Sequence, residues 1–135
     1  IQTGKMPIHP LVAVGPAAAW RGLRLDLEVM AERKTISPPD AGILHFAETP
    51  EAALAYVQNF YRRVEQIEYS KDRHSIDIRL RTDLSRGDLE KIEKDFSEEM
   101  GGLRWNPQTR VLSISQFHFR SYTSLYNLVR ALSAG

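Results

Sequence analysis

Residues 1–15, IQTGKMPIHPLVAVG, decide how the rest of the chain is interpreted. The apolar run at residues 11–14 does not alternate with polar residues, which favours a strand covered on both faces, as in a parallel sheet. The residues before it are typical of the end of one element followed by a loop that prolines interrupt. We therefore expect this strand to belong to a sheet whose other members precede Ile1.

A helix is predicted next, because four apolar residues recur at helical spacing: Trp20, Leu23, Leu27 and Met30. This stripe belongs to one amphipathic helix that runs to about Arg33. The following stretch is rich in serine and proline and is predicted to be a loop.

A second strand and helix follow this loop. Residues 43–46 are predicted to form a short strand. Thr49 is a good N-cap for the helix that follows, and Pro50 at the first helical position loses no hydrogen bond. The predicted buried face of this helix comprises Leu54, Val57, Tyr61 and Val64. Strand–helix–strand–helix is the unit of a doubly wound α/β sheet, but two parallel strands cannot cover their own faces. Residues 1–64 are therefore expected to be part of a larger sheet.

The pattern changes after about Glu65. Residues 67–70 and 75–81 are predicted to form a hairpin, in which Ile76, Ile78 and Leu80 alternate with charged residues. A helix capped by Ser85 and Asp88 follows, and Gly101-Gly102 is expected to end it. The apolar stripe of that helix comprises Leu89, Ile92, Phe96 and Met100.

A second hairpin and a final helix complete the pattern. The hairpin covers residues 103–105 and 111–119, and Ser121 or Thr123 is expected to cap the helix. Hairpin–helix, hairpin–helix predicts a ββαββα domain over residues 65–135, with a four-stranded, mostly antiparallel sheet and two helices on one face. The whole chain is thus predicted to be α/β, with this small α+β domain following the last elements of a parallel sheet.

Composition excludes several classes of function. The 135 residues carry a formal net charge of +1 and no cysteine, so disulfides, cysteine ligands and a strong electrostatic field are all excluded. No apolar run approaches membrane-spanning length and no basic-then-apolar leader is present, so we expect no membrane association. These features fit a cytoplasmic protein.

No catalytic or metal-binding constellation is visible in the sequence. The four histidines, His9, His45, His74 and His118, have no metal-binding spacing to one another or to carboxylates. Asp95, Glu98 and Glu99 are expected to form the solvated face of a helix. Gly101-Gly102 follows a helix instead of opening one, so it does not form a phosphate loop. No catalytic residue, metal or cofactor is predicted.

Two binding alternatives remain open for the second half. Basic residues gather there, namely Arg62, Arg63, Lys71, Arg73, Arg79, Arg81 and Arg86. With Tyr61, Tyr69 and residues 117–119 they resemble a single-strand-binding sheet, but interleaved acidic residues weaken the positive field and argue against nucleic acid. Trp105 and the aromatic strand end favour an apolar contact with another subunit instead. The domain is therefore expected to support homo-oligomerisation or regulation, with a small effector or nucleic acid as the alternative ligand of its open sheet face.

Several short segments resemble the LOG-type (Lonely Guy) family, once described as lysine-decarboxylase-like. They are IQTGK at residues 1–5, PLVAVG at 10–15, WRGL at 20–23, ISP at 36–38, HF at 45–46 and TPEAA at 49–53. In that family such a stretch directly follows the PGGxGTxEE signature. Residues 65–135 resemble the extension of a longer bacterial branch.

This resemblance implies a Rossmann-like nucleotide-binding fold for the parent protein. Characterised members bind nucleoside 5′-monophosphates and hydrolyse the N-glycosidic bond, releasing a free base and ribose 5-phosphate. The signature and the family's upstream arginine are absent from this chain, so no catalytic residue is carried over. The chain alone is therefore expected to have no catalytic activity. Gln2 and Lys5 are the positions nearest to the missing signature and are the candidate nucleotide contacts, with helix-end packing or a subunit contact as the favoured alternative.

Overall fold

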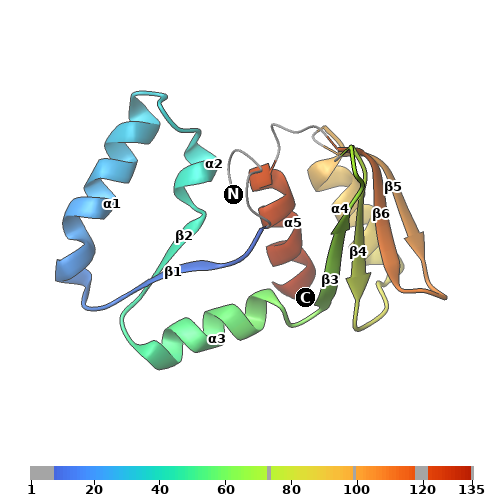
Figure 1. Ribbon diagram of the computed structural model, residues 1–135, viewed down its shortest axis with the longest axis horizontal. Coiled ribbons are helices and arrows are strands. Elements are labelled where there is room, and N and C mark those ends of the chain that lie inside the picture. The colour runs from blue at the N-terminus through green and yellow to red at the C-terminus, as the bar shows by residue number, and fades with distance from the viewer. Residues whose placement is uncertain (1–7, 73, 99, 118–121, 135) are drawn as a thin grey trace.

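Two sheets organise the chain, a two-stranded parallel sheet and a four-stranded antiparallel sheet (Figure 1). The computed structural model describes residues 8–72, 74–98, 100–117 and 122–134. The elements are β1 (Leu11–Val14), α1 (Ala17–Glu32), α2 (Pro38–Ala41), β2 (Leu44–Ala47), α3 (Pro50–Phe60), β3 (Val64–Tyr69), β4 (Ile76–Leu80), α4 (Arg86–Phe96), β5 (Met100–Asn106), β6 (Val111–Phe117) and α5 (Tyr122–Ala134). The α/β class expected from the sequence is confirmed.

The first sheet is the parallel pair that the unalternating apolar run predicts. β1 and β2 pair in register from Leu11 opposite Leu44 to Val14 opposite Ala47. α1 and α2 form the connection between them, as parallel strands require a crossover. Gly15 extends the pairing by donating its backbone N–H to the carbonyl of Ala47 at 2.9 Å.

The apolar stripe of α1 is only partly covered. None of the residues in this helix is buried, and Leu23 and Met30 remain 38% and 41% exposed. The helix contacts the parallel pair through Phe46, whose ring lies 6.3 Å from that of Trp20 and 4.3 Å below the guanidinium of Arg24. Two strands offer too little surface to cover a sixteen-residue helix.

Helix α3 begins as predicted and ends earlier. Thr49 Oγ1 accepts a hydrogen bond from the backbone N–H of Ala52 at 3.2 Å, and Pro50 follows the cap. The predicted buried face was wrong, because Leu54 is 58% exposed and Val64 begins β3 instead of ending α3. The helix buries Phe60 instead, on the side that faces α5.

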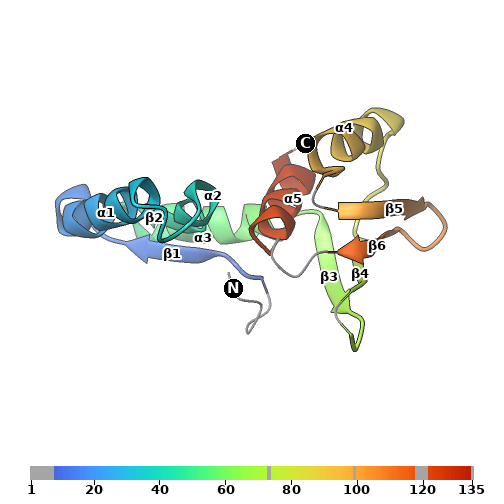
Figure 2. The ribbon, with the colours of Figure 1, turned by 90° about the horizontal axis from the view of Figure 1, so that it is seen from above.

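The second half has the predicted ββαββα order. Its strands lie in the order β3-β4-β6-β5, and every neighbouring pair is antiparallel. Figure 2 shows α4 and α5 on the same side of this sheet. The edge strand β3 has an irregular register between Val64 and Gln66, which leaves Glu65 exposed at a β-bulge.

Helix α4 is fixed at its start by a capping box. The Ser85 hydroxyl accepts from the backbone N–H of Asp88, and the Asp88 carboxylate accepts from the backbone N–H of Ser85. The predicted glycine stop was wrong: α4 ends at Phe96, and Gly101-Gly102 lies inside β5. Gly102 adopts a φ of 66°, and a Cβ there would overlap the Ser115 hydroxyl, so the position requires glycine.

One of the two predicted caps of α5, Thr123, does not take that role. Thr123 lies inside the helix, where its hydroxyl donates a hydrogen bond to Asp40 Oδ1 of α2, and Ser121 lies outside the described residues. This contact joins α5 to the first half of the chain.

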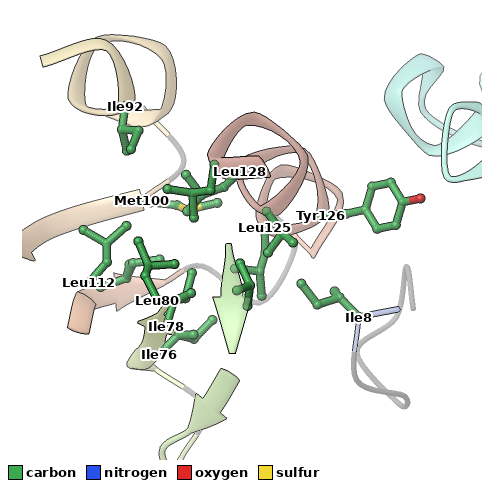
Figure 3. Close-up of a cluster of buried hydrophobic side chains, with 14 of the residues drawn as sticks. Ile8, Ile76, Ile78, Leu80, Ile92, Met100, Leu112, Leu125, Tyr126 and Leu128 are labelled. Atoms are coloured by element: carbon green, nitrogen blue, oxygen red, sulfur yellow. The ribbon is translucent and has the colours of Figure 1, made fainter. Parts of the chain in front are cut away.

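One hydrophobic core fills the space between the antiparallel sheet and its helices. Ile78 and Ile114 of the sheet and Leu125 and Leu128 of α5 are completely buried within it. Figure 3 shows this cluster, with Ile92 and Met100 at one end and Ile8 and Tyr126 at the other. Three residues from the first half also join it, namely Ile8, Ile43 and Phe60. The parallel pair is thus anchored to the same core as the antiparallel sheet.

We expect Leu128→Ala to lower the free energy of unfolding by about 2–5 kcal/mol, because it opens a cavity in this core. The matched change Leu25→Ala, on the exposed side of α1, should alter it by about 0.5 kcal/mol or less. Urea titrations of both variants measure the difference. Equal losses would show that Leu128 does not lie in the stabilising core.

Candidate functional site

The two residues predicted from the resemblance cannot be placed. Gln2 and Lys5 lie outside the described residues. Among residues 8–72, 74–98, 100–117 and 122–134, no group of three or more histidines or carboxylates could hold a metal ion. Within the same part of the chain, every helix is too short or too polar to cross a membrane.

The outward face of the antiparallel sheet is polar and of mixed charge. It presents Gln66, Glu68, Asp77 and Arg79 from neighbouring positions of β3 and β4, and Ser113 and Arg104 from β6 and β5. Acidic and basic side chains therefore alternate across this face, and their fields oppose one another.

Two of the aromatic residues expected to stack on nucleic acid, Tyr69 and Phe117, lie on the other face. Phe117 is buried, and Tyr69 and Trp105 pack against the hydrophobic core. His118 and Phe119 lie outside the described residues. Tyr69 and Phe117 therefore form no stacking platform on the described part of the open face, whereas Tyr61, at the end of α3, is 39% exposed. The subunit contact expected at Trp105 stays a prediction, because Trp105 also lines a surface recess with Arg104 and Asn106.

An aromatic cluster connects β2, α3 and α5. The imidazole of His45 stacks on the ring of Tyr56, with centroids 3.8 Å apart and the planes parallel. The Tyr56 and Tyr126 hydroxyls are hydrogen-bonded at 2.9 Å, and Tyr126 also donates to the carbonyl of Ile43 at 3.1 Å. The ring of Tyr126 packs 5.0 Å from that of Phe60. These contacts hold the ring and the hydroxyl of Tyr56 in place.

This environment shifts two pKa values. Burial, the hydrogen bond with Tyr56 and the neighbouring Tyr56 hydroxyl raise the pKa of Tyr126, so its phenol stays protonated. Burial and the positive charges of Arg130 and Arg24 lower the pKa of His45 below 6.5. The imidazole is therefore neutral at pH 7, and arginines are the charged groups that act on it.

A recess opens beside this cluster, between α3 and α5. Its volume is about 330 Å³, and its walls include Tyr56 and Asn59 from α3 and Asn127 and Arg130 from α5. The sequence alone did not single out these residues, because 70 positions separate Tyr56 from Tyr126 and no local motif joins them. Their only sequence signal is that they flank the buried positions of their helices.

A second surface is apolar and lies on the parallel pair and α1. Leu11 and Val14 at the two ends of β1 are 37% and 41% exposed, and Leu23 and Met30 of α1 are exposed to a similar degree. The indole N–H of Trp20 is buried, and no acceptor among the described residues reaches it. Buried donors are nearly always satisfied in complete folds.

Comparisons with protein-family models, with characterised proteins and with solved structures give no match. Function is therefore inferred from the sequence and the geometry.

The environment of His45 predicts a pH dependence of stability. Because its pKa is lowered in the fold, the stabilisation is complete above the unfolded value of 6.5 and is lost as the pH falls through the folded value. Asp72 and Asp88, whose pKa values are lowered from 3.8, act only in a more acidic range.

His45→Phe keeps an aromatic ring for Tyr56 to stack on and cannot be protonated. We expect its urea midpoint to fall less than that of the parent chain between pH 7.5 and pH 5.5. The other histidines are common to both proteins, so they cancel in the comparison. Parallel pH profiles would contradict the assignment.

Proposed function

We propose that this chain is the C-terminal portion of a LOG-like nucleotide-binding protein, whose parent hydrolyses the N-glycosidic bond of nucleoside 5′-monophosphates. The observation that carries the proposal is the parallel β1–β2 pair, with its helical crossover and its uncovered apolar surface. Parallel sheets are covered on both faces in nearly all proteins. A pair with exposed Leu11 and Val14 therefore calls for neighbouring strands and helices.

The uncovered surface has the residues expected of an internal contact. Leu23 and Met30 lie seven residues apart on one side of α1, so a single neighbouring element can cover both. The indole N–H of Trp20, on the same helix, is buried and has no acceptor among the described residues. Full burial of each large apolar side chain contributes about 1.5–3 kcal/mol.

The family resemblance gives these neighbours an identity. Two LOG-like segments of the sequence coincide with helix starts. Trp20 lies in the first turn of α1, and Thr49 caps α3 directly before Pro50. In such a parent, the phosphate-binding signature is expected just before residues 1–5, so Gln2 and Lys5 would lie nearest to the nucleotide. The antiparallel domain would then serve oligomerisation or regulation, and homo-oligomerisation is our first choice.

The 135-residue chain by itself is expected to release no free base from AMP or related monophosphates. It lacks the glycine-rich helix start and the glutamates that the chemistry requires. A base-release assay with each common nucleoside 5′-monophosphate measures this. Sustained turnover by the isolated chain would overturn this part of the proposal.

The native polypeptide provides the test of the contact surface. Its mass and N-terminal sequence are measured first, and Leu23→Asp is then compared with Leu25→Asp, which lies on the opposite side of α1. In a longer parent we expect Leu23→Asp to lower the melting temperature and the AMP hydrolysis rate, and Leu25→Asp to have little effect.

In the isolated 135-residue chain, both substitutions should be nearly neutral, because both side chains are exposed there. A native polypeptide that begins at Ile1, or equal effects of the two substitutions in a longer one, would contradict the proposal.

A further inference from the structure

The recess between α3 and α5 has a fixed shape. The hydroxyl of Ser133 donates to the carbonyl of Phe60 at 2.9 Å, which ties the end of α5 to the end of α3. The stacking of Tyr56 on His45 and its hydrogen bond with Tyr126 hold the side wall in place. A ligand would therefore meet a preformed site, so binding would cost little ordering entropy.

The polar groups of the recess are suited to an anion. Asn59 and Asn127 each offer two amide N–H donors, and Arg130 offers a guanidinium fork that matches carboxylate or phosphate geometry. No carboxylate is among the residues that line it, and none of the ion pairs found between described residues uses Arg130.

The remaining wall of the recess is apolar and suited to a flat ring. It consists of Tyr56, Phe60, Ala131 and Ala134. Aromatic rings pack favourably against such side chains, with offset or edge-on geometry. A volume of about 330 Å³ is at the small end of known ligand sites, so it would accept a single ring with one substituent.

We propose that this recess binds a small aromatic anion, with its ring against Tyr56 and Ala131 and its charged group on Arg130, Asn59 and Asn127. The proposal uses only residues of α3 and α5 and does not depend on the nucleotide-binding assignment of the parent. Carboxylates and phosphates share the required chemistry, and the experiment distinguishes them.

The test is a binding titration of the isotope-labelled chain followed by NMR. The probes are phenyl phosphate and benzoate, with benzamide as the neutral analogue and inorganic phosphate as the anion without a ring. We expect at least one aromatic anion to bind with a Kd of about 1 mM and to shift the side-chain amide signals of Asn59 and Asn127. Benzamide and inorganic phosphate should each bind at least about ten-fold more weakly.

Arg130→Gln should weaken the binding of the aromatic anion by about ten-fold or more, because the substitution removes a charge-assisted hydrogen bond. Arg79→Gln, on the outward face of the antiparallel sheet, is the matched control and should leave the Kd unchanged. Arg130 is exposed, so the Arg130→Gln variant is expected to fold. If that variant does not fold, Asn59→Ala provides a second test and is expected to weaken binding several-fold.

Preference for phenyl phosphate or for benzoate would support the proposal and identify the charged group. Absence of binding, equal binding of benzamide or inorganic phosphate, or an Arg130→Gln variant that folds and binds normally would overturn it.

Discussion

The side chain of Tyr126 joins the two halves of this structure. Its hydroxyl lies between the carbonyl of Ile43, just before β2, and the hydroxyl of Tyr56 on α3, while its ring packs on Phe60. The buried apolar side chains of α5 lie in the core of the antiparallel sheet, namely Leu125, Leu128, Val129 and Leu132. Together with the Thr123–Asp40 and Ser133–Phe60 hydrogen bonds, this buried residue holds the parallel pair in place relative to the sheet. Because the phenol is held protonated, this connection persists over the physiological pH range.

Burial is distributed unevenly between the two sheets. The antiparallel sheet has one face covered by α4 and α5 and one polar face, which is a self-sufficient arrangement. The parallel pair has no such division, and α1 buries none of its residues. Stability is therefore expected to reside in residues from β3 onward, together with the contacts that α5 makes to α3 and β2. The first half would open more readily than the second.

The sequence predicted the pairing of strands better than the ends of helices. Unalternating residues 11–14 and alternating residues 76–80 identified their sheets correctly. Val64 and Met100 were wrongly predicted to be helical, because each continues a helical spacing but is the first inward residue of a strand. Short apolar patterns fit both periods, and only the sheet decides between them. The recess could not be predicted, since Asn59 and Asn127 meet only after α5 has folded back onto α3.

The bulge in β3 has a consequence for how copies of this chain can meet. β3 is an edge strand, and its irregular register at Val64 and Gln66 is accompanied by the exposed charges of Glu65 and Glu68. A foreign strand arriving there would find mismatched amides and would have to desolvate carboxylates. Strand addition at this edge, and with it fibril formation, is therefore unfavourable. Self-association through β3 would have to use side-chain contacts instead of a continuous backbone hydrogen-bond ladder.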